Sequence, residues 1–292
     1  TTVQIRGLTV AQISALNTTN FGALTSDHLG AFGTTQIRAI TADDMLTLTT
    51  TQMQGMTAAN VTTLLPTQTA ALTTTVMSAF STAQLGGLTA TQMASFVGSQ
   101  ITAMTSTEIS MLAVTQLAAI ATGNIRALGT TSISALTKTQ ITGMTTAQVL
   151  ALTTTQLAAM STVQITGFTA AQLAKMTSTQ LNGLDPEDFG SMAGSQLAAL
   201  GTAQYLALDT TSFAGLSAAQ VNALSDTQLR AISTTVISAI TTATLGGLTA
   251  ATIGRLTTQQ LSALTPGELS LLTTVQFRGV TATQIQIGRA HV

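Results

Sequence analysis

Residues 9–16 read Thr-Val-Ala-Gln-Ile-Ser-Ala-Leu, and this pattern of eight residues recurs along nearly the whole chain. We number the pattern so that Thr9 is position 1 and Leu16 is position 8. From Leu8 to Val280 every position 8 is apolar, with no insertion or deletion. A register this strict indicates one short unit repeated many times, so the fold is predicted for the unit and not for a domain.

Positions 1 and 4 carry the residues that begin helices. Position 1 is mostly Thr or Ser, position 4 is mostly Gln, and position 5 is apolar in every unit except at Thr69. Thr-x-x-Gln before an apolar residue is the capping-box signature, in which the hydroxyl group accepts from the N3 amide and Gln accepts from the N-cap amide. The sequence therefore predicts a new helix every eight residues.

Proline and charge follow the same register. Pro66, Pro186 and Pro266 all stand at position 2, the first helical residue, where a missing N–H costs nothing. All 10 acidic residues stand at positions 1 to 4, and most of the 9 basic residues stand at positions 6 or 7. The helix dipole favours this distribution, which supports a helix start at position 1.

One long helix is excluded, because an advance of about 100° per residue rotates the apolar stripe by about 80° in each unit. We expect roughly six helical residues per unit, about 9 Å long, followed by a sharp turn. Such helices are marginal alone, so positions 5 and 8 should stack into a continuous apolar interior. The small residue at position 7 should let a neighbouring backbone approach. The number of units per superhelical turn and the hand of the supercoil do not follow from the sequence.

The predicted fold class is all-α: a solenoid of very short helices, continuous over residues 1–287, with about 36 units and an off-pattern tail at 288–292. The alternative is a Thr-rich β-solenoid, because Thr and Ile favour strands and eight is compatible with two-residue alternation. However, positions 5 and 8 have opposite parity and would point to opposite faces of a sheet.

Composition narrows the class of protein. The chain is 45% hydrophobic and 7% charged, with a formal net charge of −1, so we expect a surface of Thr, Ser, Ala and Gln. The chain has no apolar run long enough to span a membrane and no basic stripe for nucleic acid. Cysteine is absent, which excludes disulfides and thiolate chemistry. Thr1 is followed by no signal-like stretch, as expected of a processed or internal segment.

Few residues could carry chemistry. His28 stands at a Gln position and is expected to replace Gln as the N3 residue, and His291 lies in the tail. The acidic clusters at 43–44 and 185–188 lie in predicted first turns, where the helix dipole explains them better than a metal ion does. The 11 methionines mostly replace Leu in the predicted core. We predict no catalytic, cofactor-binding or metal-binding residue, no cofactor and no enzymatic activity.

The octad T-x-x-Q-[IL]-x-[AG]-L is intact at 9–16, and at 153–160 it ends in Met160. It resembles the short-period tracts of some large bacterial secreted and cell-surface proteins. The resemblance extends to about Ile285 and implies an extracellular structural or adhesive role, with no catalytic residue to carry over. Among the departures from the octad, Leu65, Val97, Ala113 and Ala121 lack a capping side chain at position 1, and Val76 and Val236 replace Gln at position 4.

These observations predict a structural protein that assembles into an extracellular filament, sheath or surface layer. Its expected partner is itself, through end-to-end and lateral contacts, because uncapped solenoid ends expose complementary stacking surfaces. No nucleic acid and no membrane span are expected, and a cell surface or a polysaccharide is a further partner class. Two alternatives stay open: a spacer or adhesin stalk that does not assemble, and a regular Thr array that binds ice or polysaccharide.

Overall fold

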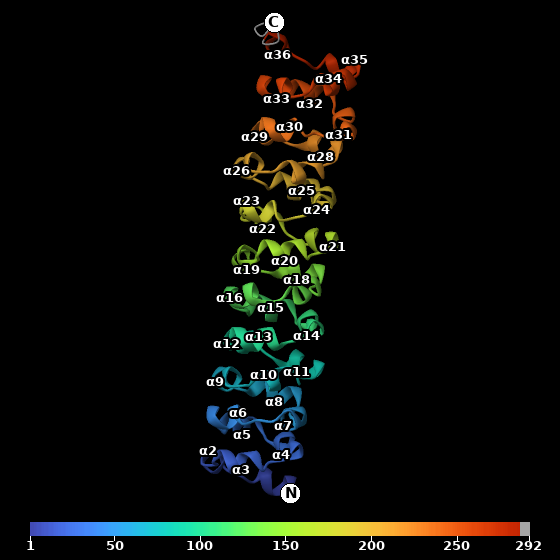
Figure 1. Ribbon diagram of the computed structural model, residues 1–292. Coiled ribbons are helices and arrows are strands. Elements are labelled where there is room, and N and C mark those ends of the chain that lie inside the picture. Colours follow the sequence, from blue (N-terminus) through green and yellow to red (C-terminus); the bar gives the residue numbers. More distant parts are fainter. Residues whose placement is uncertain (287–292) are drawn as a thin grey trace. The chain divides into compact units, whose positions relative to one another are not determined.

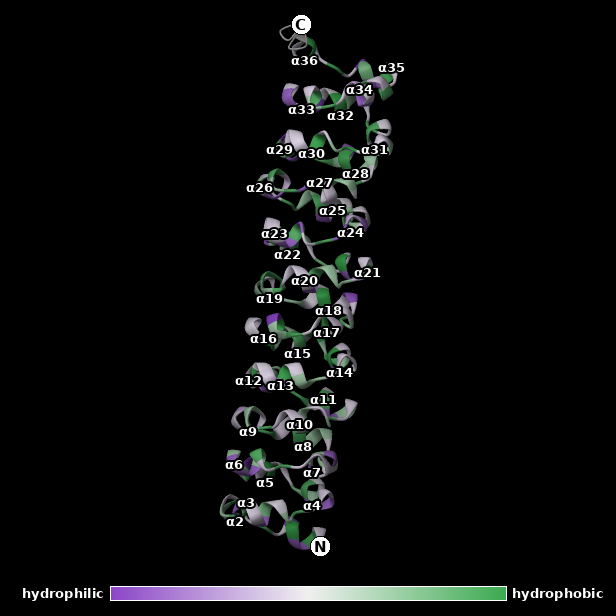
Figure 2. Cartoon of the chain, viewed as in Figure 1, coloured by the Kyte–Doolittle hydropathy of each residue, from purple (hydrophilic) through white to green (hydrophobic). Residues whose placement is uncertain are grey.

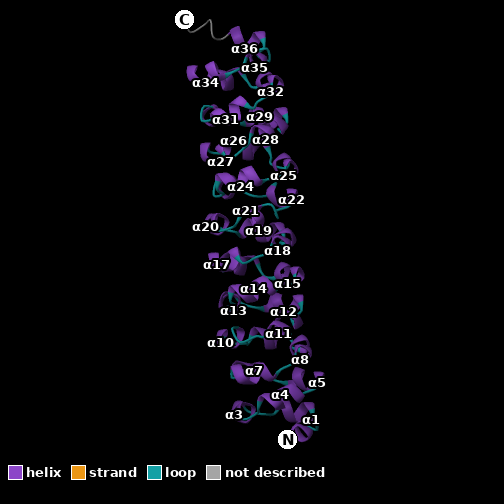
Figure 3. Ribbon diagram, turned by 90° about the vertical axis from the view of Figure 1, so that its right-hand side faces the viewer, coloured by secondary structure: helices purple, strands orange, loops and turns teal. Residues whose placement is uncertain are grey.

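The computed structural model describes residues 1–286, which form short α-helices joined by tight turns (Figure 3). No strand occurs in these residues, so the all-α prediction is confirmed and the β-solenoid alternative is wrong. The chain forms two compact units, Thr1–Ala151 and Leu152–Val292, and each is described by itself. The tail predicted at 288–292 lies outside the described residues.

The first unit contains the helices α1 to α19, with the following bounds: α1 Thr2–Arg6, α2 Val10–Ser14, α3 Thr18–Gly22, α4 Ser26–Ala31, α5 Thr34–Ala39, α6 Ala42–Leu46, α7 Thr50–Gly55, α8 Ala58–Thr63, α9 Pro66–Ala70, α10 Thr74–Met77, α11 Thr82–Gly87, α12 Ala90–Ser95, α13 Gly98–Ala103, α14 Ser106–Met111, α15 Val114–Ala119, α16 Thr122–Ala127, α17 Thr130–Ser134, α18 Lys138–Gly143 and α19 Thr146–Ala151.

The second unit contains α20 to α36 within the described residues: α20 Thr154–Ala158, α21 Thr162–Ile165, α22 Ala170–Leu173, α23 Ser178–Leu181, α24 Pro186–Ser191, α25 Gly194–Ala198, α26 Thr202–Leu206, α27 Thr210–Ala214, α28 Ala218–Ala223, α29 Asp226–Ala231, α30 Thr234–Ile237, α31 Thr242–Gly246, α32 Ala250–Arg255, α33 Thr258–Ser262, α34 Pro266–Leu271, α35 Thr274–Phe277 and α36 Ala282–Gln286.

The predicted capping box starts each regular helix. In α12, Thr89 Oγ1 accepts from the Gln92 amide at 3.2 Å, and Gln92 Oε1 accepts from the Thr89 amide at 2.7 Å. The helix ends when Phe96, at position 8, turns to extended backbone with φ −66° and ψ 137°. No described residue has a positive φ, so the turns need no left-handed glycine. An extended residue at position 8 leads straight into the next N-cap, which explains how an eight-residue unit closes.

Within each of the two compact units the chain coils, so that a helix packs against the third helix after it. In the first unit α6, α9 and α12 follow one another along one side, as Figure 1 shows. In the second unit α26 and α29 are neighbours in the same way. Short helices with marginal intrinsic stability are thereby held by the turn above and the turn below.

The core is built from positions 5 and 8, as predicted. Met93 at position 5 is fully buried and Phe96 at position 8 is nearly so, and Leu229 and Ile232 repeat this in the second unit. Because most octads contribute apolar side chains at positions 5 and 8, hydrophobic and hydrophilic residues alternate within short distances along each compact unit (Figure 2). Burial of apolar area is therefore spread evenly over the helices and not concentrated in one centre.

Small residues at position 7 let neighbouring helices approach closely. A Cβ atom added to Gly55 of α7 would lie 2.5 Å from Cα of Ser26 in α4, closer than real Cβ contacts come. Gly215 of α27 has the same relation to Pro186 of α24, where the added atom would lie 2.6 Å from the carbonyl carbon. The sequence-based prediction of a close backbone approach at position 7 is confirmed at these sites.

Replacing Gly55 by Ala should lower the free energy of unfolding by about 1–3 kcal/mol, because the added methyl group overlaps the backbone of α4. Gly86 of α11 is the matched control, since nothing lies within 4 Å of an added Cβ there. Gly86→Ala should stabilise the protein by about 0.5–1 kcal/mol through helix propensity. Urea denaturation of both variants checks this, and equal effects at the two sites would contradict the close contact.

Candidate functional site

The Gln side chain at position 4 joins the ends of two different helices. In α11, Gln84 Oε1 accepts from the Ser81 amide at 2.8 Å, which completes the capping box. The other end of the same side chain, Nε2, donates to the carbonyl oxygens of Met53 and Met56 at 2.6 and 2.7 Å. Those carbonyl groups lie at the C-terminal end of α7, four helices earlier. We call this arrangement the glutamine clasp.

The glutamine clasp recurs in both compact units. Within each unit Nε2 lies 2.6–3.0 Å from the carbonyl oxygen 28 residues earlier, at the following residues: Gln36, Gln52, Gln68, Gln84, Gln92, Gln100, Gln116, Gln140, Gln148, Gln180, Gln196, Gln204, Gln220, Gln228, Gln260, Gln276 and Gln284. Nearly all of these side chains are buried. The expectation that this Gln contributes to the surface is therefore wrong, because its amide group is used between helix ends.

The clasp answers a problem that very short helices create. The last four carbonyl groups of a helix have no partner inside it, and a helix of four to six residues leaves most of its backbone groups in this state. A buried carbonyl group without a partner costs about 1–3 kcal/mol. One Gln amide group supplies partners at both kinds of helix end, because it accepts from an amide at the start of one helix and donates to carbonyl groups at the end of another. Helices therefore pack against the third helix after them and clasp the fourth before them, so a turn of the coil takes between three and four helices.

A second set of hydrogen bonds connects position 6 to the carbonyl group of position 7 three helices later. Ser14 Oγ donates to Ala39 at 3.0 Å and Thr62 Oγ1 donates to Gly87 at 2.7 Å. The cationic side chain of Arg38 does the same, with Nε donating to Thr63 at 3.3 Å. Basic residues at position 6 thus interact with a helix C-terminus, as the helix dipole favours, but the helix is a neighbour and not their own.

Shorter residues at position 4 keep only part of the clasp. Asn60 Nδ2 donates to Phe32 at 3.0 Å and Asn124 Nδ2 donates to Phe96 at 2.8 Å, each reaching only the carbonyl group 28 residues earlier. Thr244 Oγ1 reaches the corresponding carbonyl group of Leu216 at 3.0 Å. Val76 and Val236 have no polar side-chain atom and cannot donate. The length and chemistry of position 4 thus set how many bonds each unit makes.

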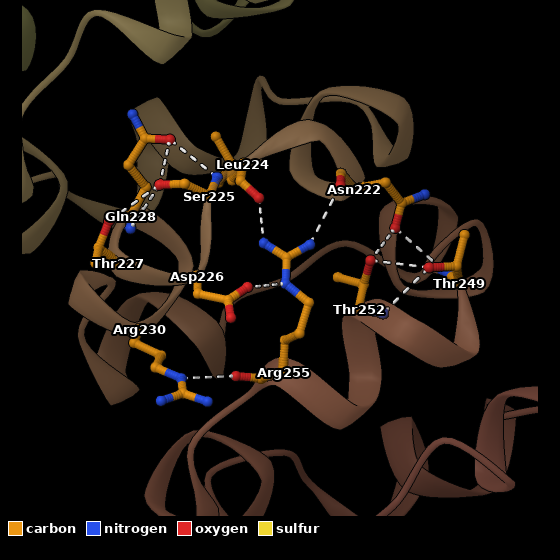
Figure 4. A network of polar contacts seen from close by, with 10 residues as sticks. All are labelled: Asn222, Leu224, Ser225, Asp226, Thr227, Gln228, Arg230, Thr249, Thr252 and Arg255. Atoms are coloured by element: carbon orange, nitrogen blue, oxygen red, sulfur yellow. Dashed lines mark hydrogen bonds and ion pairs between the residues drawn. The ribbon is translucent and has the colours of Figure 1, made fainter.

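Where Thr252 replaces Gln in α32, two other residues supply the missing bonds (Figure 4). The guanidinium group of Arg255 donates to the carbonyl oxygens of Leu224 and Asn222 at the end of α28, and its Nε pairs with Asp226 at 2.6 Å. Asn222 Oδ1 accepts from the Thr249 amide at 3.1 Å, the bond that a Gln oxygen makes elsewhere. The two functions of the missing Gln amide group are therefore divided: Arg255 provides the donor and Asn222 provides the acceptor.

The same replacement of the acceptor occurs in α27, where Ser212 stands at position 4. Asn182 Oδ1 accepts from the amide of the N-cap residue Asp209 at 3.3 Å, and Asn182 Nδ2 donates to Ala207 at 2.8 Å. Within residues 1–286 no side chain replaces the donor here as Arg255 does in α32. Ser212 Oγ is buried and has no hydrogen-bond partner in the described residues. Sequence reasoning missed these partners, although both Asn residues at position 6 precede a non-Gln position 4 by the same interval.

The residues considered for chemistry take structural positions. His28 replaces Gln as predicted, with Nδ1 accepting from the Thr25 amide at 3.3 Å. The clusters at 43–44 and 185–188 lie at the starts of α6 and α24, and no group of three His, Cys, Asp or Glu residues in the described chain could hold a metal ion. Burial raises the pKa of Tyr205, whose hydroxyl group donates to Leu197 at 3.0 Å. His291 lies outside the described residues.

The surface offers open depressions where position 1 is glycine. One lies beside Gly33 in the first unit and is lined by Arg6, Thr34 and Asn60. Another lies beside Gly201 in the second unit. Both are lined by a glycine at position 1, where the N-cap residue has no side chain. Separately, none of the helices in residues 1–286 is long and apolar enough to cross a membrane.

Comparisons with known proteins identify repeat character. A family model described as the ALTTAQ repeat matches residues 117–154. Within that stretch, residues 135–140 read Ala-Leu-Thr-Lys-Thr-Gln, which are the small residue, the core residue, the N-cap, two first-turn residues and the clasp Gln. This stretch is similar to that repeat, and together with the regularly spaced short helices it makes the chain a repeat protein.

No curated protein matches the chain significantly. Among solved structures, the leucine-rich repeat-containing protein LegL7 from Legionella pneumophila matches over 92% of this chain and 94% of its own, with 11% identity and a TM-score of 0.21. At that TM-score nothing known of LegL7 is carried over to this chain.

Replacing Gln84 by Glu should lower the free energy of unfolding by about 1–3 kcal/mol, because Glu keeps the acceptor for Ser81 and loses both donated bonds to α7. Gln12→Glu is the matched control. Gln12 Oε1 accepts from the Thr9 amide at 2.8 Å, but its exposed Nε2 donates to no described residue. Chemical denaturation at pH 7 measures both variants, and equal effects would show that the donated bonds contribute nothing.

Replacing Arg255 by Ala should destabilise the second unit by about 1–2 kcal/mol, because the carbonyl groups at the end of α28 lose their donor. Adding Thr252→Gln to that variant should restore most of the loss, since Gln at position 4 reaches those carbonyl groups in other units. A double-mutant cycle measures this interaction energy. Additive effects of the two substitutions would contradict the assigned replacement.

Proposed function

We propose that this chain is a structural protein, not an enzyme, that assembles into an extracellular filament, sheath or surface layer. The observation that carries the proposal is the glutamine clasp, which commits the most regularly placed polar side chain to holding neighbouring helices together. Each helix offers nearly the same side chains as the next, so no single place gathers a distinct set of polar groups of the kind that catalysis requires.

Self-association follows from the same geometry. Wherever a stack of these units ends, one face carries Gln amide donors and the other carries helix carbonyl groups at the spacing that pairs with them. A second stack therefore finds complementary partners at such a face, and head-to-tail contacts that do not close produce filaments. The low content of charged residues, 7%, leaves little electrostatic repulsion against lateral packing of Thr-rich surfaces.

The extracellular location rests on the resemblance of the octad to tracts in bacterial secreted and cell-surface proteins and on the absence of cysteine. The Thr-array surface for ice or polysaccharide predicts a flat face and favours a β-solenoid, so the absence of any strand in the described residues counts against it. We therefore do not retain it. A spacer or adhesin stalk uses the same solenoid without assembly and is the second candidate.

Negative-stain electron microscopy and light scattering of the purified chain, over a range of protein concentrations, separate these two functions. Filaments or sheets whose amount rises with concentration are expected, because association is governed by mass action. Monodisperse particles that persist at high concentration would sink the assembly proposal and favour the stalk. Gln54→Lys, at an exposed position 6 of α7 outside the clasp, is a suitable solubility control.

A further inference from the structure

Asp188 of α24 places an acidic side chain at position 4, where most units have the Gln of the clasp. Its side chain is 3% exposed, and Oδ2 accepts from the Asp185 amide at 3.1 Å, so the capping half of the clasp is present. A carboxylate group has no hydrogen to donate, so the second half of the clasp, to the end of α20, depends on a proton.

The length of the side chain is sufficient for that second half. Asn60 and Asn124 have the same length as Asp, and at the same position each donates to the carbonyl group 28 residues earlier, at 3.0 and 2.8 Å. The corresponding acceptor for Asp188 is the carbonyl group of Met160, directly after α20. A neutral carboxyl group is nearly isosteric with the Asn amide group and carries one donor hydrogen.

We propose that Asp188 is a proton-operated clasp: its neutral carboxyl group donates to the Met160 carbonyl group and ties α24 to the end of α20, and loss of the proton opens this tie. The acidified second unit is then held by a bond that it lacks at neutral pH.

The charged groups around Asp188 favour the neutral form. On its own helix lie Asp185, the N-cap residue, and Glu187. The helices packed against α24 are α21 and α27, and α28 clasps its C-terminal end; none of them contains a titratable residue, and only Asp209, the N-cap of α27, adds a charge, which is negative. No cation lies in these elements to hold the carboxylate form.

Burial raises the pKa of the Asp188 carboxyl group above its ordinary value of 3.8, and the negative charges of Asp185 and Glu187 raise it further, against the lowering effect of the Asp185 amide. The folded chain therefore keeps this proton at pH values where the unfolded chain has lost it. The stability contributed by the proton is fully present below pH 3.8 and is lost as the pH rises through the raised pKa.

Asp44 of α6 provides a natural comparison at the same register position. It is also buried, but the Thr41 hydroxyl group donates to its Oδ2 at 2.7 Å. Asp188 has Asp185 in place of that Thr. Asp44 and Asp188 thus differ in the residue at position 1, and the proton-operated clasp is assigned to Asp188.

Amide hydrogen exchange of the whole chain, corrected for intrinsic rates, tests the proposal at pH 4 and pH 7. We expect the amides of α24 to be about tenfold better protected at pH 4, the effect of one added hydrogen bond. In Asp188→Asn the donor is permanent, so protection should be high and equal at both pH values. Asp44→Asn should leave the pH response of α24 unchanged.

Asp185→Thr is a second variant that keeps Asp188 and gives it the hydroxyl partner that Asp44 has. It should move the protection change in α24 to lower pH, a result that loss of packing alone would not produce. Equal protection of wild-type α24 at both pH values, or a pH response that survives in Asp188→Asn, would overturn the proposal. Neither outcome bears on whether the chain forms filaments.

Discussion

The structure depends on one side-chain amide group that accepts at the start of one helix and donates at the end of another. Helices of four to six residues leave most of their backbone hydrogen-bonding groups without internal partners, and water cannot satisfy them where the coil is packed. Gln is the residue that meets both needs, because its amide group has an acceptor and donors about 2 Å apart on a flexible stem. The apolar residues at positions 5 and 8 make burial favourable, and the amide group gives hydrogen-bond partners to the many helix ends that burial removes from water.

This division between local and distant partners explains what the sequence could predict. Helix starts were predictable because Thr89 and Gln92 satisfy each other within a single turn, and so was the position of Pro66 at the first helical residue. The number of helices per turn was not, because it depends on which distant carbonyl group Gln92 Nε2 reaches, and that is set by the packing of Leu64 and its neighbours. For the same reason Gln was expected at the surface and is buried.

The octads without Gln at position 4 also have distant partners that the sequence of one octad does not reveal. Thr252 stands in the Gln column, and Arg255 stands at position 7 of the same octad. The structure brings both to the end of α28, where Thr252 donates to the Asn222 side-chain oxygen and Arg255 donates to the Asn222 carbonyl group. No rule that reads one unit at a time could connect these three residues, because the partners come from units four apart.

Distant pairing also constrains how such a chain can lengthen during evolution. Asn222 and Thr252 are 30 residues apart, so insertion of a single octad between them would separate the Asn222 side-chain oxygen from the Thr252 hydroxyl group that donates to it. Lengthening by blocks that carry both members of a pair avoids this loss. Two similar stretches lie 160 residues apart: TTTVMSAFSTAQLGGLTA at 73–90 and STTVISAITTATLGGLTA at 233–250, both with valine in the Gln column and two adjacent glycines. Each is just over two octads long and is too short to hold a pair spaced like Asn222 and Thr252. A block that preserves such a pair must span at least four octads, although a single octad is enough to form one helix.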